Sequence, residues 1–170
     1  GVYGVGAVRA MDELGYSSVF HAAVGVSAGA PTAAYLLGEN TRNGGRVIYE
    51  DCCTREFFNP FRWNNPLDSE ILQLVVEGKT GKPVNVDKVL EHPTDYYIGV
   101  SKFKTGEPHL ICPKNEEELF VGIRASVSMP GAVTAYIEID GVRYIDGSST
   151  NPHIIEHAWN TIDDATHVLV

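Results

Sequence analysis

The sequence predicts a single domain of the α/β class, in which helices pack against a mainly parallel sheet. Segments with apolar residues at helical spacing alternate along the chain with short, continuous apolar runs of the kind that form buried strands. The chain has 170 residues, the size of one compact domain. Hydrophobic residues make up 44% of it and charged residues 21%, which is typical of a globular protein and too apolar for a disordered one.

The first part of the chain predicts a helix, a strand and a second helix. Apolar residues recur at helical spacing over 5–14 and stop at Gly15, which indicates a helix. The apolar run over 18–24 suits a fully buried strand, and the Ala- and Leu-rich segment 28–37 predicts the second helix. Two further expectations complete this part: a loop at Asn43-Gly44-Gly45 within 39–66, and a helix over 67–76.

Capping and turn residues define the elements of the second part. Asn85 suits the cap of a short helix that ends at Leu90. Asn115 and Glu118 resemble a capping box at the start of a helix that should end by Pro130-Gly131. The other predicted elements are strands over 96–101 and 109–112 joined by a turn at 104–106, a hairpin over 137–145 with Asp140-Gly141 at its tip, a helix over 153–159 and a buried strand over 166–170.

The charge balance excludes several partners. Lys and Arg total 13 against 22 for Asp and Glu, so the formal net charge is −9, and nucleic acid is not an expected partner. Anionic lipid surfaces would repel the chain, so a peripheral membrane contact should rest on apolar residues. No apolar run approaches the ~20 residues that a membrane-spanning helix needs.

The cysteines and histidines give no sign of a cofactor. The three cysteines include the adjacent pair Cys52 and Cys53, which suits neither a disulfide framework nor a zinc site. The six histidines form no HExxH pattern. We therefore expect reduced thiols, a cytoplasmic location with membrane association left open, no metal and no cofactor.

The most specific local motif is Gly25-Val26-Ser27-Ala28-Gly29, between a predicted strand and a predicted helix. In this order the motif predicts a nucleophile elbow, a tight bend that exposes the Ser27 hydroxyl. Gly25 and Gly29 would remove side chains that collide where strand and helix fold back on each other. The N–H groups at the start of the helix, that of Ala28 first, would face a developing oxyanion. The alternative is a glycine-rich bend with an incidental serine.

A second motif, Asp146-Gly147, follows a predicted strand directly. Asp-Gly pairs are common turn formers, so on its own the motif favours a turn over a catalytic role. Asp140-Gly141 is the same dipeptide and is explained as the hairpin tip. Asp146 differs because Ser148-Ser149-Thr150 and a helix come after it rather than a strand.

With Ser27 and Asp146 identified, nearly the whole chain resembles a patatin-like phospholipase domain. Residues 1–11 are similar to the segment that follows that family's glycine-rich oxyanion box, and residues 24–31 match its nucleophile elbow. Residues 124–131, which begin Arg124-Ala125-Ser126, match a helix end typical of the family, and residues 140–147 match its DG motif region.

The resemblance implies a three-layer α/β/α fold and a lipid acyl hydrolase with a Ser–Asp dyad. Ser27 would be the nucleophile that a lipid ester acylates, and Asp146 the proton acceptor, with Gly147 and Ser148 completing the DG motif. An aspartate, whose ordinary pKa is about 3.9, is a weak base for a serine hydroxyl. It can act only in hydrogen-bond contact with the serine and in a water-poor site.

The resemblance also implies that the domain formed by residues 1–170 is incomplete. The family's glycine box and the strand before it lie upstream of Gly1, which would supply at most the last of the oxyanion donors. Ser148 stands where the family usually has Gly or Ala, a small change that fits. We expect residues 1–170 expressed alone to be poorly soluble and to have little esterase activity.

Two alternatives to the dyad enzyme stay open from the sequence. One is a conventional α/β-hydrolase with His153, His157 or His167 as base, although only seven residues separate Asp146 from His153. The other is a domain that binds lipid or a partner protein without catalysis.

The aromatic stretch that includes Phe57, Phe58, Phe61 and Trp63 is the candidate lipid-facing segment, an irregular flap near the site. Burial of these rings in the core is the favoured interpretation.

Overall fold

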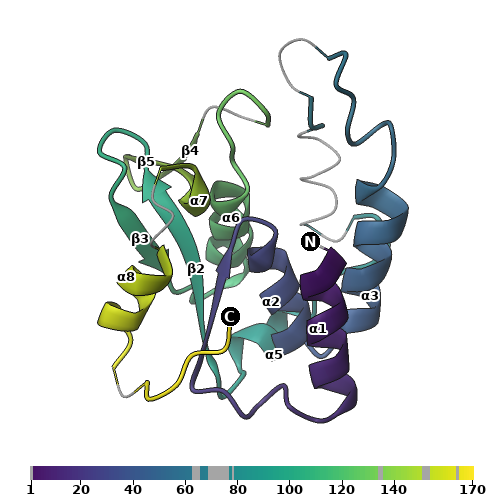
Figure 1. Ribbon diagram of the computed structural model, residues 1–170, viewed down its shortest axis with the longest axis vertical. Helices are drawn as coiled ribbons and strands as arrows, with labels where there is room; N and C mark the ends of the chain where they lie inside the picture. Colours follow the sequence, from purple (N-terminus) through teal and green to yellow (C-terminus); the bar gives the residue numbers. More distant parts are fainter. Residues whose placement is uncertain are drawn as a thin grey trace.

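A mixed sheet with helices on both faces forms the centre of the computed structural model, which describes residues 2–62, 66–68, 77, 79–133, 136–150, 154–163 and 165–170 (Figure 1). The predicted α/β class is confirmed. The helices are α1 (Val2–Glu13), α2 (Gly29–Leu37), α3 (Thr41–Arg46), the π-helix η1 (Val47–Cys52), α5 (Val86–Leu90), α6 (Glu116–Ser126), α7 (Gly147–Thr150) and α8 (Ile154–Thr161). The strands are β1 (Ala22–Val26), β2 (Asp95–Lys102), β3 (Pro108–Ile111), β4 (Ile137–Ile139) and β5 (Val142–Asp146).

Strand β2 is the centre of the sheet. It pairs with β1 in parallel, and with β3 and β5 in antiparallel orientation, while β4 pairs with β5 in antiparallel orientation. Among the described strands the sheet is therefore less parallel than the sequence predicted. The physical reason is the short connections after β2 and β4, which can join only antiparallel neighbours.

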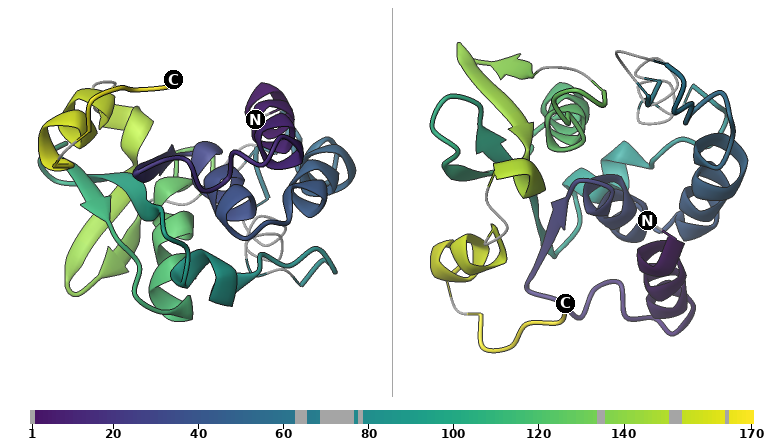
Figure 2. Two further views of the ribbon diagram at one scale, coloured as in Figure 1. Left: turned by 90° about the horizontal axis from the view of Figure 1, so that it is seen from below. Right: turned by 45° about the horizontal axis from the view of Figure 1, so that its top comes forward.

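The helices form layers on the two faces of the sheet. In the right-hand view of Figure 2, α2 and α6 lie on one side of the strands and α8 on the other. Neighbouring residues of β2 point to these opposite layers. A Cβ on Gly122 of α6 would touch the Ile98 side chain, whereas one on Gly99 would touch Ile154 of α8. The core lies between β2, α2 and α6, where Leu37, Ile98, Leu119 and Ile123 are fully buried.

Most boundaries predicted from local signals hold. Asn85 and Asn115 cap α5 and α6 by accepting hydrogen bonds from the N–H groups of Lys88 and Glu118. The Glu118 carboxylate accepts from the Lys114 N–H, so the capping box forms with its return bond shifted by one residue. The hairpin tip has positive φ angles at both Asp140 and Gly141, as an Asp-Gly turn requires.

Three predicted elements differ from the structure. The strand predicted as fully buried over 18–24 is β1, and only its Gly25 is buried, because β1 lies at the edge of the described sheet. Asn43-Gly44-Gly45 lies inside α3 instead of a loop, since Gly44 lets the helix approach the Tyr35 ring, which an added Cβ would meet at 2.8 Å. The segment 166–170 pairs with no described strand, and its apolar side chains are exposed instead of buried in the sheet. The helix predicted over 67–76 lies almost wholly outside the described residues; Leu67 forms a β-bridge with Phe58.

Candidate active site

The chain turns sharply at Ser27, between the end of β1 and the start of α2. Ser27 has φ +54°, a left-handed conformation that is strained for a residue with a side chain. A Cβ on Gly25 would lie 2.5 Å from the Cα of Ala30, so only glycine allows strand and helix to approach this closely. Nothing lies within 4 Å of the corresponding position on Gly29, so the expectation that Gly29 relieves a collision is wrong.

Asp146, the last residue of β5, is fully buried. Its Oδ1 accepts hydrogen bonds from the backbone N–H of Ser148 at 2.9 Å and from the Ser148 hydroxyl at 2.7 Å. Its Oδ2 is buried and has no hydrogen-bond partner among the described residues. Because buried polar atoms are nearly always paired, an unpaired carboxylate oxygen indicates a functional group rather than a structural one.

The sheet register explains why Ser27 and Asp146 lie close together. Because β3 pairs with β2 over Ile98–Ser101, β1 and β5 must share the opposite edge of β2. Strand β1 runs along that edge and ends with Val26 beside Gly99, whereas β5 runs in the other direction and ends with Asp146 beside Val100. The two strand ends therefore meet on one edge, as the right-hand view of Figure 2 shows.

Ser27 and Asp146 line one cavity of about 240 Å³. Apolar side chains make up most of its wall, among them Val5, Val47, Ile48, Phe57, Val127 and Met129. No hydrogen bond joins the Ser27 hydroxyl to Asp146 in the part of the chain that the structure describes. Catalytic hydrogen bonds are often long before substrate binds, so this separation is compatible with proton transfer in a complex.

The backbone N–H groups near Ser27 differ in whether they are free to bind an oxyanion. The N–H of Ala28, which directly precedes α2, has no hydrogen-bond partner among the described residues and is free to bind an anion. The N–H of Ser27 is not free, since it donates to the Ser126 hydroxyl at 2.9 Å. Gly1, the other predicted donor, lies outside the described residues.

The DG motif packs against β2. A Cβ on Gly147 would lie 2.9 Å from the Gly99 carbonyl oxygen, so this position also needs glycine. The Gly147 carbonyl accepts a hydrogen bond from the Ser101 hydroxyl. The sequence predicts only that Ser148 fits its position and that Ser126 belongs to a family-typical helix end. Neither side chain carries a sequence signal for its contact, because both contacts depend on the tertiary fold.

The structure describes two of the three histidines proposed for a triad, and neither belongs to the wall of this cavity. Neither His157, on α8, nor His167 lines it, and His167 contacts Thr166 instead. His153 lies outside the described residues.

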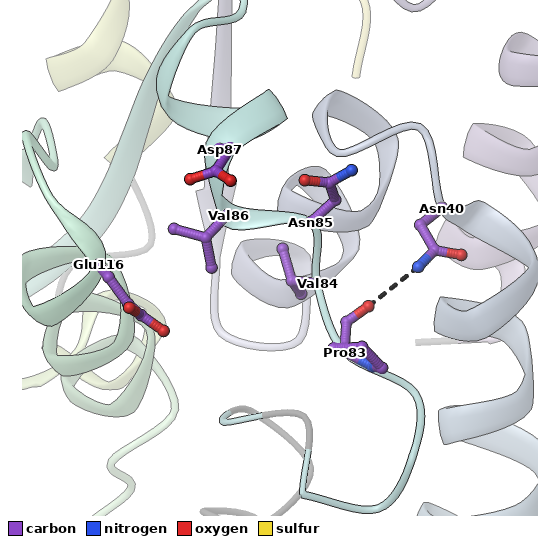
Figure 3. A pocket seen from close by; sticks show the side chains of 7 residues that line it. All are labelled: Asn40, Pro83, Val84, Asn85, Val86, Asp87 and Glu116. Carbon is purple, nitrogen blue, oxygen red and sulfur yellow. Dashed lines mark hydrogen bonds between the residues drawn. The ribbon is translucent and has the colours of Figure 1, made fainter.

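A second, open groove of about 470 Å³ lies beside α5. Its polar side chains serve the local backbone: Asn85 caps α5, and Asn40 donates to the Pro83 carbonyl (Figure 3). Asp87 and Glu116 add carboxylates, but no serine or cysteine among the described residues lines the groove. The groove is therefore not a candidate for nucleophilic chemistry.

The aromatic stretch does not fill the core as the favoured interpretation expected. Phe57 lines the cavity, but Phe58 and Phe61 are 51% and 94% exposed. The segment folds back on itself with an isolated β-bridge between Phe58 and Leu67, and both rings stay in contact with solvent. Trp63 lies outside the described residues.

Within the described part of the chain, no helix combines the length and apolar character that crossing a membrane requires.

Two comparisons with known proteins bear on the family of this chain. The family model for patatin-like phospholipase matches residues 1–159. A relative, "Uncharacterized protein YjjU" of Escherichia coli strain K12, is 24% identical over 139 residues, which are 79% of this chain and 39% of that protein. The chain thus spans about two fifths of the length of this relative. From the family match over nearly its whole length, the chain belongs to the patatin-like phospholipase family.

Proposed function

We propose that this protein is a lipid acyl hydrolase that cleaves carboxylic esters of phospholipids or acylglycerols through Ser27 and Asp146. The observation that carries the proposal is that one apolar cavity is lined both by a strained serine and by an aspartate whose buried Oδ2 has no hydrogen-bond partner among the described residues. Apolar walls suit an acyl chain, and a few convergent polar groups at one end are what an ester reaction needs. Family membership supports the same class of reaction.

In the first step, the Ser27 Oγ attacks the ester carbonyl carbon while its proton passes to Asp146. The carbonyl oxygen becomes an oxyanion, which the N–H of Ala28 stabilises together with the positive end of α2. The C–O bond of the ester then breaks. The leaving alcohol takes the proton from Asp146, and the acyl group stays on Ser27.

In the second step, water attacks the acyl-serine and gives its proton to Asp146. The fatty acid leaves, and the proton returns to the Ser27 Oγ. Ser148 has a defined part in both steps. It holds Oδ1 with two hydrogen bonds, so Oδ2 is the oxygen that can receive the proton.

We further propose that the enzyme contacts its lipid at a surface. The exposed rings of Phe58 and Phe61 belong to the same segment as Phe57, which lines the cavity. Met129, 40% exposed, also lines it. An exposed apolar patch next to an apolar cavity is the arrangement expected of a protein that draws its substrate from a lipid surface.

The dyad is tested with Ser27→Ala and Asp146→Asn in the full-length protein. Each variant should lower the hydrolysis of a soluble short-chain nitrophenyl ester by about a thousandfold or more, as loss of a nucleophile or its base does elsewhere. Asp140→Asn is the matched control, since this aspartate also precedes a glycine but lies at an exposed hairpin tip. It should keep full activity.

Other outcomes separate the remaining alternatives. Asp146→Asn with most of its activity would refute the dyad, and loss of activity in His157→Ala or His167→Ala would favour a histidine base. If a fluorophosphonate probe fails to label Ser27 in the folded wild type, a binding module without catalysis is the better description.

A further inference from the structure

The Ser126 hydroxyl lies at the end of α6 and links the residue that follows β1 to the backbone of β2. It accepts a hydrogen bond from the Ser27 N–H at 2.9 Å and donates one to the Gly99 carbonyl oxygen at 2.8 Å. Ser126 is fully buried, and 99 residues separate it from Ser27 in the sequence. The hydroxyl thus stands between the end of β1 and the backbone of β2.

This contact lies where the β1–β2 ladder stops. The last paired residues are Val26 and Gly99, and the residue that follows β1 is the strained Ser27. Instead of a direct bond to β2, the Ser27 N–H reaches the Gly99 carbonyl through the Ser126 hydroxyl. The Ser126 hydroxyl therefore links the two backbones at the point where the chain leaves β1 and turns into α2.

The turn that follows α6 also holds the other strand end. The Ser128 carbonyl oxygen accepts a hydrogen bond from the Asp146 N–H at 2.8 Å. One short segment, residues 126–128, therefore bonds to the backbone of both proposed catalytic residues. A shift of this segment would move Ser27 and Asp146 relative to each other.

We propose that Ser126 is a positioning residue that fixes the bend at Ser27 and so directs its hydroxyl at the substrate carbonyl; this rests on the proposed function. Without the hydroxyl, the Ser27 N–H and the Gly99 carbonyl both lose their partner in a buried site. The Ser27 bend then gains alternative conformations, in which its Oγ no longer meets the carbonyl carbon.

The test compares Ser126→Ala, Ser126→Thr and the control Thr94→Val in the full-length protein. Thr94 carries another buried hydroxyl, bonded to the Phe20 carbonyl near the other end of the same strand pair. We expect Ser126→Ala to lower kcat for a soluble ester, and the rate of fluorophosphonate labelling, by about 10- to 100-fold with KM little changed. Thr94→Val should keep the wild-type rate, and Ser126→Thr, which retains the hydroxyl, should recover most of it.

A second measurement does not depend on activity. Hydrogen exchange of the Ser27 amide should become at least several-fold faster in Ser126→Ala and stay unchanged in Thr94→Val. If Ser126→Ala keeps both the wild-type kcat and the protection of this amide, the positioning role is refuted. An inactive wild type would refute the proposed function alone, because the exchange measurement would still report on Ser126.

Discussion

Ser27 shows how single residues make the bend at the end of β1. Its positive φ is strained, and glycine at position 25 leaves room for the backbone of Ala30. The two glycines of the motif are therefore unequal. Gly25 faces backbone atoms that cannot move, whereas Gly29 faces open space.

This inequality predicts opposite effects on stability. Gly25→Ala should destabilise the protein by about 1–3 kcal/mol or more, since the new methyl group overlaps the backbone of α2. Gly29→Ala should be neutral or stabilising by up to about 1 kcal/mol, because alanine favours the helix and meets no atom. Urea unfolding of both variants measures the difference. Equal destabilisation by the two changes would contradict the described packing at the bend.

At the scale of elements, a cluster of charges joins η1 to the segment before α5. The Lys82 ammonium lies 2.7 Å from Asp51 and 3.0 Å from Glu50. Burial lowers the pKa of Lys82, but hydrogen bonds to the two carboxylates outweigh it and leave the pKa raised. The Tyr35 hydroxyl, from α2, donates to the Lys82 carbonyl and adds a third element to this junction.

The same cluster predicts that the stability of the fold depends on pH. Hydrogen bonds from Arg46 and Lys82 lower the pKa of Glu50 to about 2 in the folded protein. A carboxyl whose folded pKa is lowered stabilises the fold above its ordinary pKa, and this contribution is lost as the pH falls towards 2. Glu50→Gln should therefore lower the melting temperature at pH 7 and lose this effect near pH 2.

Melting curves from pH 7 to pH 2 for wild type and Glu50→Gln provide the measurement. Glu91→Gln is the control, because Glu91 is exposed and has no ion pair among the described residues. Added salt should shrink the effect of Glu50→Gln, since exposed charges are screened. A difference between wild type and Glu50→Gln that stays constant down to pH 2 would exclude the ion pairs as its cause.

At the scale of the whole molecule, the segment that carries Phe58 and Phe61 and the loop after α6 lie at the same end, the top of Figure 1. Phe61→Ser should reduce cosedimentation with zwitterionic phosphatidylcholine vesicles several-fold, because it removes the most exposed of these rings from the proposed lipid-facing patch. Hydrolysis of a soluble short-chain ester should not change.

Tyr16→Ser is the control for this change. Tyr16 is 50% exposed and belongs to the segment after α1, at the opposite end of the molecule in Figure 1. It should leave vesicle binding unchanged. If Phe61→Ser binds vesicles as the wild type does, the patch is not the surface that meets lipid.

Local sequence patterns suffice to predict the features that depend on a few neighbouring residues. These are the α/β class, the caps at Asn85 and Asn115, the hairpin at Asp140-Gly141 and the strand–bend–helix order around Ser27. Each follows from steric limits or hydrogen bonds within a turn or two of the chain, so local patterns suffice to predict it. Ser27 and Asp146 were also selected from the sequence, although only as candidates.

Contacts between distant parts of the chain could not be predicted from local patterns, because they depend on how the whole chain packs. The shared edge of β2 brings the ends of β1 and β5 together, and the end of α6 supplies the Ser126 hydroxyl between them. The same holds for the helical state of Asn43-Gly44-Gly45, set by packing on Tyr35, and for the unpaired end at 166–170. A local pattern predicts which side chains a segment can bury and which hydrogen bonds it can make. The segments that it contacts depend on how the whole chain packs around one core.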